Sequence, residues 1–321
     1  MRLGALALAL VVCALPLVAE AQPAGKVARI GVLALSASPN IEAFRQRLHE
    51  LGHVEGQSVV FEYRWEAGKP ERLSALAAEL VRLKVDVILA PGTAAAVAAK
   101  RVTSEMPVVF ATVADPIGAG LVASLARPGG NMTGATTINA ELDEKRLDLL
   151  RQLSPRASRI AILFSASDPS NVAGLERVKR HVLEAGLTAQ IFGVREGRDV
   201  DGAFASMRSA RTEGMIVFAS PFLSALYGRI VEHAARNRIS AIYATRTAVE
   251  AGGLMSYAAN FRERHRYAAT YVDKILKGAR PADLPVDQPT TFEFVINLKT
   301  AKAIGLTIPP SLLLRADQII E

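Results

Sequence analysis

The two halves of the sequence repeat one pattern. Residues 28–39 read ARIGVLALSASP and residues 158–169 read SRIAILFSASDP, with the arginine and the proline of each copy in register. Each copy is an apolar run followed by small polar residues and a proline. This is typical of a buried parallel strand that leads through a loop into a helix. The repeat therefore predicts an α/β fold class with two equivalent units.

Strand-like and helix-like segments alternate along both halves, as βαβ units require. The predicted strands are 29–35, 59–63, 85–90, 108–111 and 132–136 in the first half, and 159–164, 189–194, 214–218 and 241–243 in the second. The predicted helices are 41–51, 70–83, 94–101, 143–153, 172–185, 202–211 and 223–237. Late segments at 252–257, 262–277, 292–297 and 299–306 are expected to cross back between the units.

The first 21 residues have the pattern of a secretory signal peptide. A short positive start precedes an apolar stretch at 3–17, which is shorter than the ~20 residues of a membrane span. A small-x-small cleavage pattern ends at Ala21, so we expect a mature chain that begins near Gln22. No second apolar stretch of that length follows. The sequence therefore predicts a soluble periplasmic protein.

The only cysteine of the chain, Cys13, lies inside the predicted signal. Val12 precedes it where a lipoprotein signal has a small residue, so cleavage at Ala21 is favoured over acylation of Cys13. The mature chain would then carry no thiol. This excludes disulfides, zinc–thiolate sites and cysteine nucleophiles.

The formal net charge of +7 admits partners such as nucleic acid, anionic lipid or an anionic ligand. Lysines and arginines, however, are interspersed with acids along the predicted helices and form no basic block. Aromatic residues make up 6% of the chain, which is too few for a stacking platform. We therefore expect no nucleic-acid partner.

Ligands of open parallel sheets bind beyond the carboxyl ends of the strands, so the loops there are the candidate sites. In the first half, the hydroxyls of Ser36 and Ser38 can bond a ligand, with a helix cap at Ser38 or Asn40 as the alternative. Gly92 and Thr93 open a helix whose free N–H groups suit an anion, with a plain cap as the alternative. The last loop of this set follows Thr112. Its Asp115 can accept from a ligand ammonium or form an Asx turn.

The equivalent loops of the second half contain Ser165, Ser220 and Thr245. Arg246 is a candidate anion partner, although an arginine after a strand is commonly a solvated or packing side chain. Together the two sets of loops would line a cleft between the units.

Sequence motifs that would indicate an enzyme are weak. Residues 118–123 read GAGLVA, which matches the dinucleotide fingerprint G-x-G-x-x-A, but they follow the fourth strand candidate instead of joining the first strand to the first helix. The five histidines have no metal-ligand spacing, and no nucleophile elbow or phosphate loop occurs. We expect no cofactor and no metal. A secreted α/β enzyme stays the alternative, because catalytic residues can converge from distant segments.

Several longer phrases carry a resemblance to a known family. They are LGHVEGQ at 51–57, LKVDVI at 83–88, LARPGGNMTG at 125–134, GGLMSY at 252–257, YVDKILKG at 271–278 and NLKTAK at 297–302. These phrases resemble the substrate-binding proteins of ABC importers, in the family that includes tryptophan and tyrosine binders. The resemblance spans nearly all of the predicted mature chain.

The resemblance implies a type I periplasmic binding fold, with two Rossmann-like lobes of parallel sheet joined by a hinge of three crossovers. We expect one lobe at 27–136 plus about 258–285 and the other at 137–257 plus about 286–321. It also implies a non-enzymatic, monomeric protein that closes on a small molecule and delivers it to a permease and its ATPase. A ligand-presenting sensor subunit is the other possibility.

In members that bind aromatic amino acids, the first-strand, Gly-Thr and Asp-Pro loops contact the ligand. Carried over, the resemblance implies contacts from Ser36, Ser38, Gly92, Thr93, Thr112 and Asp115. Tyr257 is a candidate stacking or hinge residue, with core packing as its alternative. The ligand class expected is an amino acid, aromatic amino acids included, or a related small carboxylate.

Overall fold

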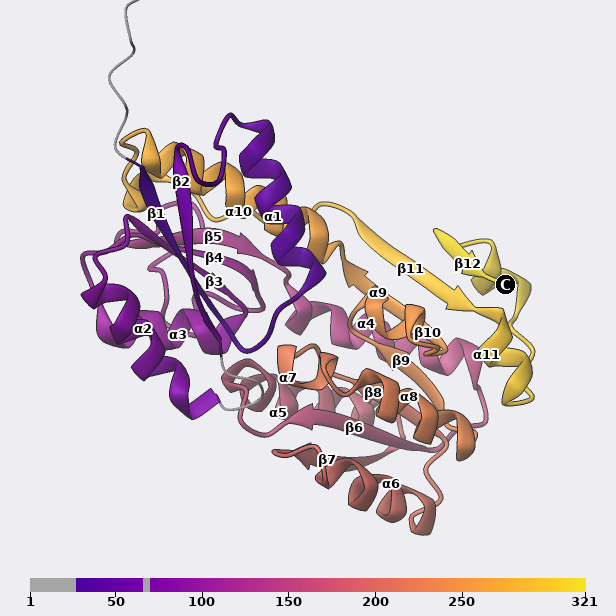
Figure 1. Cartoon of the computed structure of the whole chain (residues 1–321). Coiled ribbons are helices and arrows are strands. Elements are labelled where there is room, and N and C mark those ends of the chain that lie inside the picture. The colour runs from indigo at the N-terminus through magenta and orange to yellow at the C-terminus, as the bar shows by residue number, and fades with distance from the viewer. Residues whose placement is uncertain (1–26, 66–69) are drawn as a thin grey trace, which may run out of the picture.

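The computed structural model describes residues 27–65 and 70–321, so the predicted signal peptide lies outside the described residues. The described residues form two separate sheets, each in its own lobe (Figure 1). The strands of the first sheet lie in the order β2-β1-β3-β4-β5 and are all parallel. They are β1 (Ala28–Ala34), β2 (Val59–Trp65), β3 (Val87–Pro91), β4 (Val108–Val113) and β5 (Met132–Thr136).

The second sheet has the order β12-β11-β10-β9-β8-β6-β7. Its strands are β6 (Arg159–Ser165), β7 (Thr188–Val194), β8 (Gly214–Val217), β9 (Ser240–Tyr243), β10 (Met255–Ala259), β11 (Phe292–Asn297) and β12 (Gln318–Ile320). The run β7-β6-β8-β9-β10 has the same parallel order as the first sheet, and β11 is added antiparallel to β10. The repeat in the sequence thus corresponds to a repeat in topology, and the predicted α/β class is confirmed.

Both faces of each sheet are covered by helices, which is why central strands such as β3, β4 and β6 are mostly apolar. In the first lobe, α1 (Pro39–Glu50) and α10 (Phe261–Leu276) cover one face, and α2 (Leu73–Arg82) and α3 (Thr93–Val102) cover the other. The alternation along β1 shows this: Val32 packs under α1 and α10, whereas Leu33 packs under α2 and α3. Figure 1 shows α10 beside α1, although they are distant in sequence.

The second lobe is built in the same way. One face carries α4 (Asn139–Leu153), α5 (Pro169–Glu184), α11 (Leu298–Ala303) and α12 (Pro310–Leu313). The other carries α6 (Asp199–Ser209), α7 (Pro221–Ser224), α8 (Tyr227–Arg236) and α9 (Arg246–Glu250). The single predicted helix at 223–237 is two helices, because α7 ends at Ser224 and α8 begins at Tyr227. The short elements β12, α9 and α12 were not predicted.

The chain crosses between the lobes three times. It leaves the first lobe after β5 and enters the second with α4. It returns between β10 and α10, and it crosses again between η2 (Pro281–Asp283) and β11. The isolated bridge between Ala135 and Asp287 places the first and third crossings side by side.

A buried histidine in α10 predicts a pH dependence of stability. Burial of His265 lowers its pKa to about 4, and its ring Nδ1 lies 2.8 Å from the carbonyl oxygen of Phe261. The unfolded chain has a histidine pKa of about 6.5, so the unfolded state binds more protons between these two values. The contribution of His265 to stability is therefore fully present above about pH 6.5 and is lost as the pH falls toward 4.

We expect the folded protein to lose about 2 kcal/mol through this group between pH 7 and pH 4.5. Denaturant unfolding at both pH values measures it, and His265→Gln should remove this part of the pH dependence. The exposed His49 provides the control, since His49→Gln should leave the dependence unchanged. Equal pH dependence in His265→Gln and the wild type would contradict the prediction.

Candidate functional site

The loops at the carboxyl ends of the two sheets meet between the lobes. A Cβ atom placed on Gly92, after β3, would lie 3.3 Å from Cγ of Pro221, after β8. The helices α3 and α5, one from each lobe, are also in contact. The edges where ligands of parallel sheets bind therefore face each other, and the lobes touch there.

The predicted serines at these edges cap helices. Ser38 Oγ accepts from Asn40 N at 3.2 Å at the start of α1, and Ser220 Oγ accepts from Phe222 N at 3.2 Å at the start of α7. The capping alternative is therefore what the structure has. Each hydroxyl keeps its own hydrogen to donate. Ser36 lies half-buried in the loop between β1 and Ser38.

Gly92 and Thr93 form a tight turn from β3 into α3. Gly92 has φ of +83°, a conformation that glycine adopts without steric cost, and its N–H donates to Ala111 O at 2.7 Å. Thr93 is buried, and its Oγ1 accepts from Ala114 N at 3.5 Å. No side chain caps α3 at this end. Its first N–H groups thus have no intrahelical acceptor and stand at the edge that faces the second lobe.

A β-bulge shapes the end of β4. The register with β5 shifts between Phe110 and Val113, and Thr112 between them has φ of +57°, which is a steric outlier for a β-branched residue. The Thr112 hydroxyl donates to Ala111 O at 2.7 Å. Asp115 follows on the surface, where its Oδ1 accepts from Gly118 N at 2.8 Å. This is the Asx-type turn that was the alternative to ligand contact.

In the second lobe the predicted residues Ser165 and Thr245 are buried, and each lies within hydrogen-bond distance of a neighbouring hydroxyl. Ser165 Oγ lies 3.3 Å from Ser167 Oγ, and Thr245 Oγ1 lies 3.0 Å from both Tyr227 Oη and Thr247 Oγ1. Two separate groups of hydroxyls therefore lie at the ends of β6 and β9. A hydroxyl can reorient its donor and acceptor around a polar ligand.

Two further candidates have partners within the second lobe. Arg246 is ion-paired with Glu250 at 2.7 Å, so its charge is already met within the second lobe. Tyr257 lies half-buried in β10, with its ring centroid 5.9 Å from that of Phe292 and 6.4 Å from that of Phe294. The packing alternative is therefore what the structure has for Tyr257.

Sequence reasoning missed one side chain that organises the second lobe's edge. The Oδ1 atom of Asn171 accepts from Ser165 N at 2.9 Å, and its Nδ2 donates to Ala219 O at 2.8 Å, which ties the ends of β6 and β8 together. Asp168 beside it caps α5 through Ser170 N at 3.0 Å, and burial raises its pKa. The sequence held a signal for the cap, because Asp168 aligns with Ser38 in the repeat, but none for Asn171, which aligns with Ile41.

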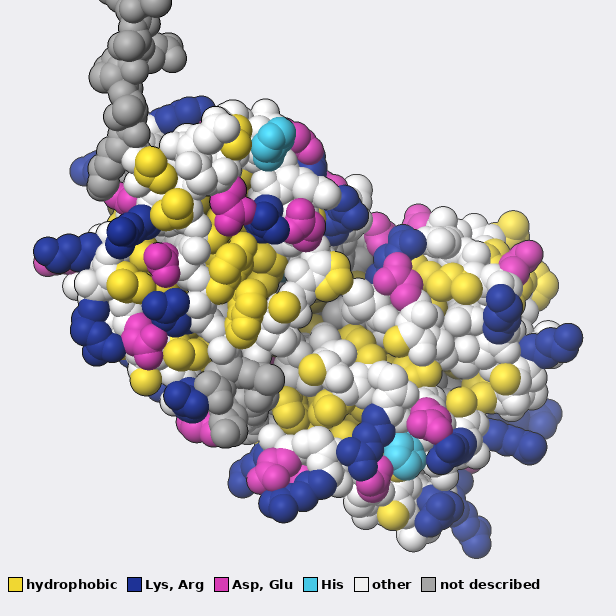
Figure 2. All heavy atoms as spheres, viewed as in Figure 1, with side chains coloured by type: hydrophobic (Ala, Val, Ile, Leu, Met, Phe, Trp, Pro, Cys, Tyr) yellow, Lys and Arg dark blue, Asp and Glu magenta, His cyan; other side chains and the backbone are white. Residues whose placement is uncertain are grey.

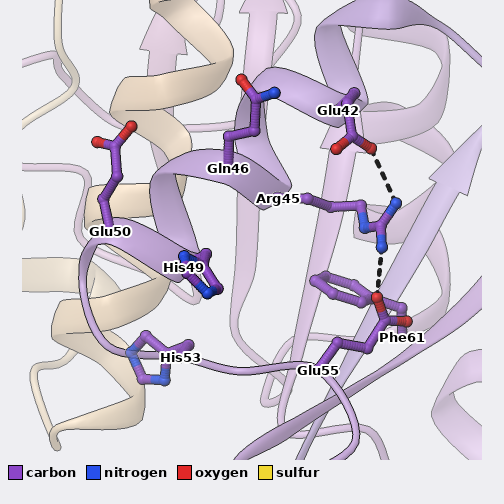
Figure 3. A pocket seen from close by; sticks show the side chains of 8 residues that line it. All are labelled: Glu42, Arg45, Gln46, His49, Glu50, His53, Glu55 and Phe61. Atoms are coloured by element: carbon purple, nitrogen blue, oxygen red, sulfur yellow. Dashed lines mark hydrogen bonds and ion pairs between the residues drawn. The ribbon is translucent and has the colours of Figure 1, made fainter.

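A separate pocket of about 380 Å³ lies on the outer side of the first lobe (Figure 3). Its lining comes from α1, β2 and the loop between them: Glu42, Arg45, Gln46, His49, Glu50, His53, Glu55 and Phe61. Arg45 bridges Glu42 and Glu55 and lies over the ring of Phe61, so its charge is met by two carboxylates. The pocket is lined by the first lobe alone, so it is not part of the candidate site between the lobes.

Other classes of site find little support in the described residues. Across 27–65 and 70–321, no group of three or more His, Cys, Asp or Glu side chains could hold a metal ion. The same ranges include no helix long and apolar enough to cross a membrane. On the face shown in Figure 2, basic side chains are interspersed with acidic ones over both lobes, with no continuous basic field.

Comparison with known proteins shows which family has this architecture. Residues 34–320 match the family model described as ABC transporter substrate binding protein. A tyrosine-binding protein of Clostridioides difficile is 25% identical over 291 residues, which cover 88% of this chain and 82% of that protein.

Two solved structures are also similar. The ABC domain in complex with L-Trp from Streptococcus pneumoniae has a TM-score of 0.83 and 28% identity, covering 91% of this chain and 99% of that one. A conserved domain protein from Vibrio cholerae has a TM-score of 0.85 and 25% identity, covering 92% and 100%. With the match of the family model over most of its length, the chain belongs to the ABC transporter substrate-binding protein family.

Proposed function

We propose that this protein is the extracytoplasmic binding subunit of an ABC importer. It captures a small molecule between its lobes and delivers it, by hinge closure, to a permease driven by an ATPase. The observation that carries the proposal is the meeting of the two sheets' carboxyl-end loops at Gly92 and Pro221, in a chain whose lobes are joined by three crossings. A ligand held there touches both lobes only when they are closed, so it stabilises the closed state.

The ligand we propose is an amino acid, with an aromatic one favoured, or a related small carboxylate. The facing loops carry hydroxyls from Ser36, Thr93, Ser165 and Thr245, and α3 opens on an uncapped N-terminus. Hydroxyls and helix N–H groups suit a carboxylate without a lysine or arginine. The names of the two relatives, a tyrosine binder and a complex with L-Trp, support an aromatic side chain.

The remaining parts of the proposal concern how the protein works in the cell. We infer a monomer without enzymatic activity that is exported to the periplasm by the signal-like residues 1–21, with cleavage near Ala21. Conversion of a bound compound by the purified protein would contradict the non-enzymatic role. Binding without transport, in cells that carry the permease and ATPase, would favour a sensor.

Ligand binding is tested by thermal unfolding with L-tryptophan, L-tyrosine, L-phenylalanine and small aromatic acids. A ligand at 100 times its Kd is expected to stabilise the fold by about 2.7 kcal/mol, so the Tm should rise with concentration. Mass spectrometry of small molecules that co-purify with the protein extends the search beyond this panel. Absence of any stabilising or co-purifying compound, with correctly folded protein, would contradict solute capture.

One substitution tests the site itself. Thr93→Val keeps the shape of the side chain and removes its hydroxyl, so affinity for the ligand should fall roughly 10- to 100-fold if that hydroxyl bonds a carboxylate. Thr270→Val, in α10 and remote from the facing loops, is the matched control and should bind as the wild type does. Titration calorimetry measures both. Equal affinities of Thr93→Val and the wild type would show that the Thr93 hydroxyl does not bond the ligand.

A further inference from the structure

Among the residues that the structure describes, five non-glycine residues have a left-handed backbone, and for three of them the position in the fold gives an ordinary reason. Lys84, Arg211 and Arg238, with φ of +50° to +53°, each stand two residues after the end of a helix. This is the position where helices commonly end in the left-handed conformation. The remaining two, Thr112 and Ile138, are β-branched, for which this conformation is a steric outlier. Ile138 is the one that lies on a crossing between the lobes.

The residues just before Ile138 are held by the first lobe. Thr137 N donates to Val113 O at 2.9 Å, and Thr136 Oγ1 donates to the same oxygen at 2.7 Å. Thr136 N also donates to Asp287 O at 2.9 Å. Asp287 is itself ion-paired with Arg264 of α10. The chain is therefore immobilised against the first lobe up to Thr137.

The residue just after Ile138 is held by the second lobe. Asn139 begins α4, and the fully buried Arg146 donates to its carbonyl oxygen at 3.3 Å and to its Oδ1 at 2.9 Å. Arg146 also donates through Nε to Tyr257 O at 2.8 Å, in the strand that leads to the second crossing. The arginine thus fastens the second-lobe ends of two crossings to one guanidinium.

These anchors leave a single residue to absorb rotation in the first crossing. The second crossing is also a single residue, and the third is longer. Asn260 stands between β10 and α10 with φ of −73°, and residues 288–291 link Asp287 to β11 without regular structure. In the arrangement described, where the lobes touch at Gly92 and Pro221, Ile138 has φ of +46°. Backbone strain of this kind persists only where the surrounding structure holds it in place.

We propose that Ile138 is the pivot of the first crossing and that its left-handed backbone is a strained state tied to lobe closure. Rotation of the lobes apart lets this residue return to an ordinary conformation, so the strain favours opening. Residue 138 then sets the ratio of closed to open protein and, through it, ligand affinity. The inference rests on the proposed closure of the lobes around a ligand. The identity of residue 138, however, affects the closed-to-open ratio before any ligand binds.

The test measures lobe separation in the ligand-free protein. Spin labels on Ser104→Cys and Ser206→Cys, which are exposed serines in the first and second lobes, report the distance, with Cys13 replaced by serine. Ile138→Gly and Ile138→Asn both relieve the strain, since glycine and asparagine accept the left-handed conformation. Each is expected to raise the closed-to-open ratio roughly 5- to 30-fold. Lys84→Gly, which relaxes an exposed left-handed residue within the first lobe, should leave the ratio unchanged.

The outcomes separate this inference from the proposed function. An unchanged distance distribution in both Ile138 variants, or an equal shift in Lys84→Gly, would overturn the pivot whatever the ligand proves to be. A shift toward closure supports it even if neither L-tryptophan nor L-tyrosine binds. Where one of them does bind, its Kd should fall in the Ile138 variants by up to the same factor, and a Kd equal to that of the wild type would contradict control of affinity by residue 138.

Discussion

Arg146→Met is expected to lower the free energy of unfolding by about 3–5 kcal/mol, the usual cost of removing one partner from a buried ion pair. Arg146 has no exposed surface, and its Nη1 lies 2.5 Å from Oδ1 of the buried Asp143. Methionine would leave that carboxylate, the Asn139 acceptors and the Tyr257 carbonyl without their donor. Denaturant unfolding at neutral pH measures the loss.

The pH dependence of this variant identifies the cause. Burial already raises the pKa of Asp143, and the charge of Arg146 opposes that rise. Without the arginine the folded state binds a proton more tightly than the unfolded state does, so stability of Arg146→Met should fall as the pH rises above the ordinary range of an aspartate. Adding Asp143→Asn should recover part of the loss and flatten the dependence.

The control for Arg146 is an arginine on the surface of the same lobe. Arg236 pairs with Glu232 in α8, with both side chains largely exposed, so Arg236→Met should cost less than about 0.5 kcal/mol. A similar loss of stability in both variants would show that the burial of Arg146 does not determine its contribution to stability. A small loss in Arg146→Met would refute its role as the link between two crossings.

Gly134→Ala is the second substitution with a large expected effect, a loss of at least about 3 kcal/mol. Gly134 lies in β5 with φ of +149°, and a Cβ atom there would overlap the backbone oxygen of Phe110 in β4. Backbone cannot move aside as a flexible side chain can. The two strands would separate beside the bulge that positions Thr112. Thermal or denaturant unfolding measures the change.

Gly130→Ala is the matched control. It lies four residues earlier in the loop that leads into β5, has no atom within 4 Å of an added Cβ, and is not among the glycines with positive φ. Its substitution should change stability by no more than about 0.5 kcal/mol. If Gly134→Ala is as stable as Gly130→Ala, the close approach of β4 and β5 does not constrain the fold.

Much of the fold could be predicted because it follows from local patterns. Buried parallel strands are continuous apolar runs, so the run at 159–164 was predicted to within one residue of β6. The strands at 132–136 and 292–297 were predicted with the bounds that the structure has. Elements with weak patterns were missed. β12 has three residues and an exposed edge, and α9 has five residues. α4 begins at Asn139, four residues before the predicted start, because the crossing at Ile138 and the bonds from Arg146 set that boundary.

The candidate site was less predictable, because one residue type serves several purposes. Serine after a strand is suited both to a ligand and to a helix cap, and Ser38 and Ser220 cap helices here. Asp115 closes its own turn. The ligand contacts of the ten candidate residues stay predictions, which binding measurements on variants must test.

The sequence by itself determined that two similar α/β units exist and most of the strands they contain, because apolar periodicity and the repeat are properties of neighbouring residues. Only the tertiary structure decided how the units are joined. Three features depend on residues more than a hundred positions apart, or on a backbone angle set by such contacts. They are the contact of Gly92 with Pro221, the hydrogen bonds of Arg146 at two crossings and the strain at Ile138. No local pattern encodes them, since their energies arise only when distant segments are packed together.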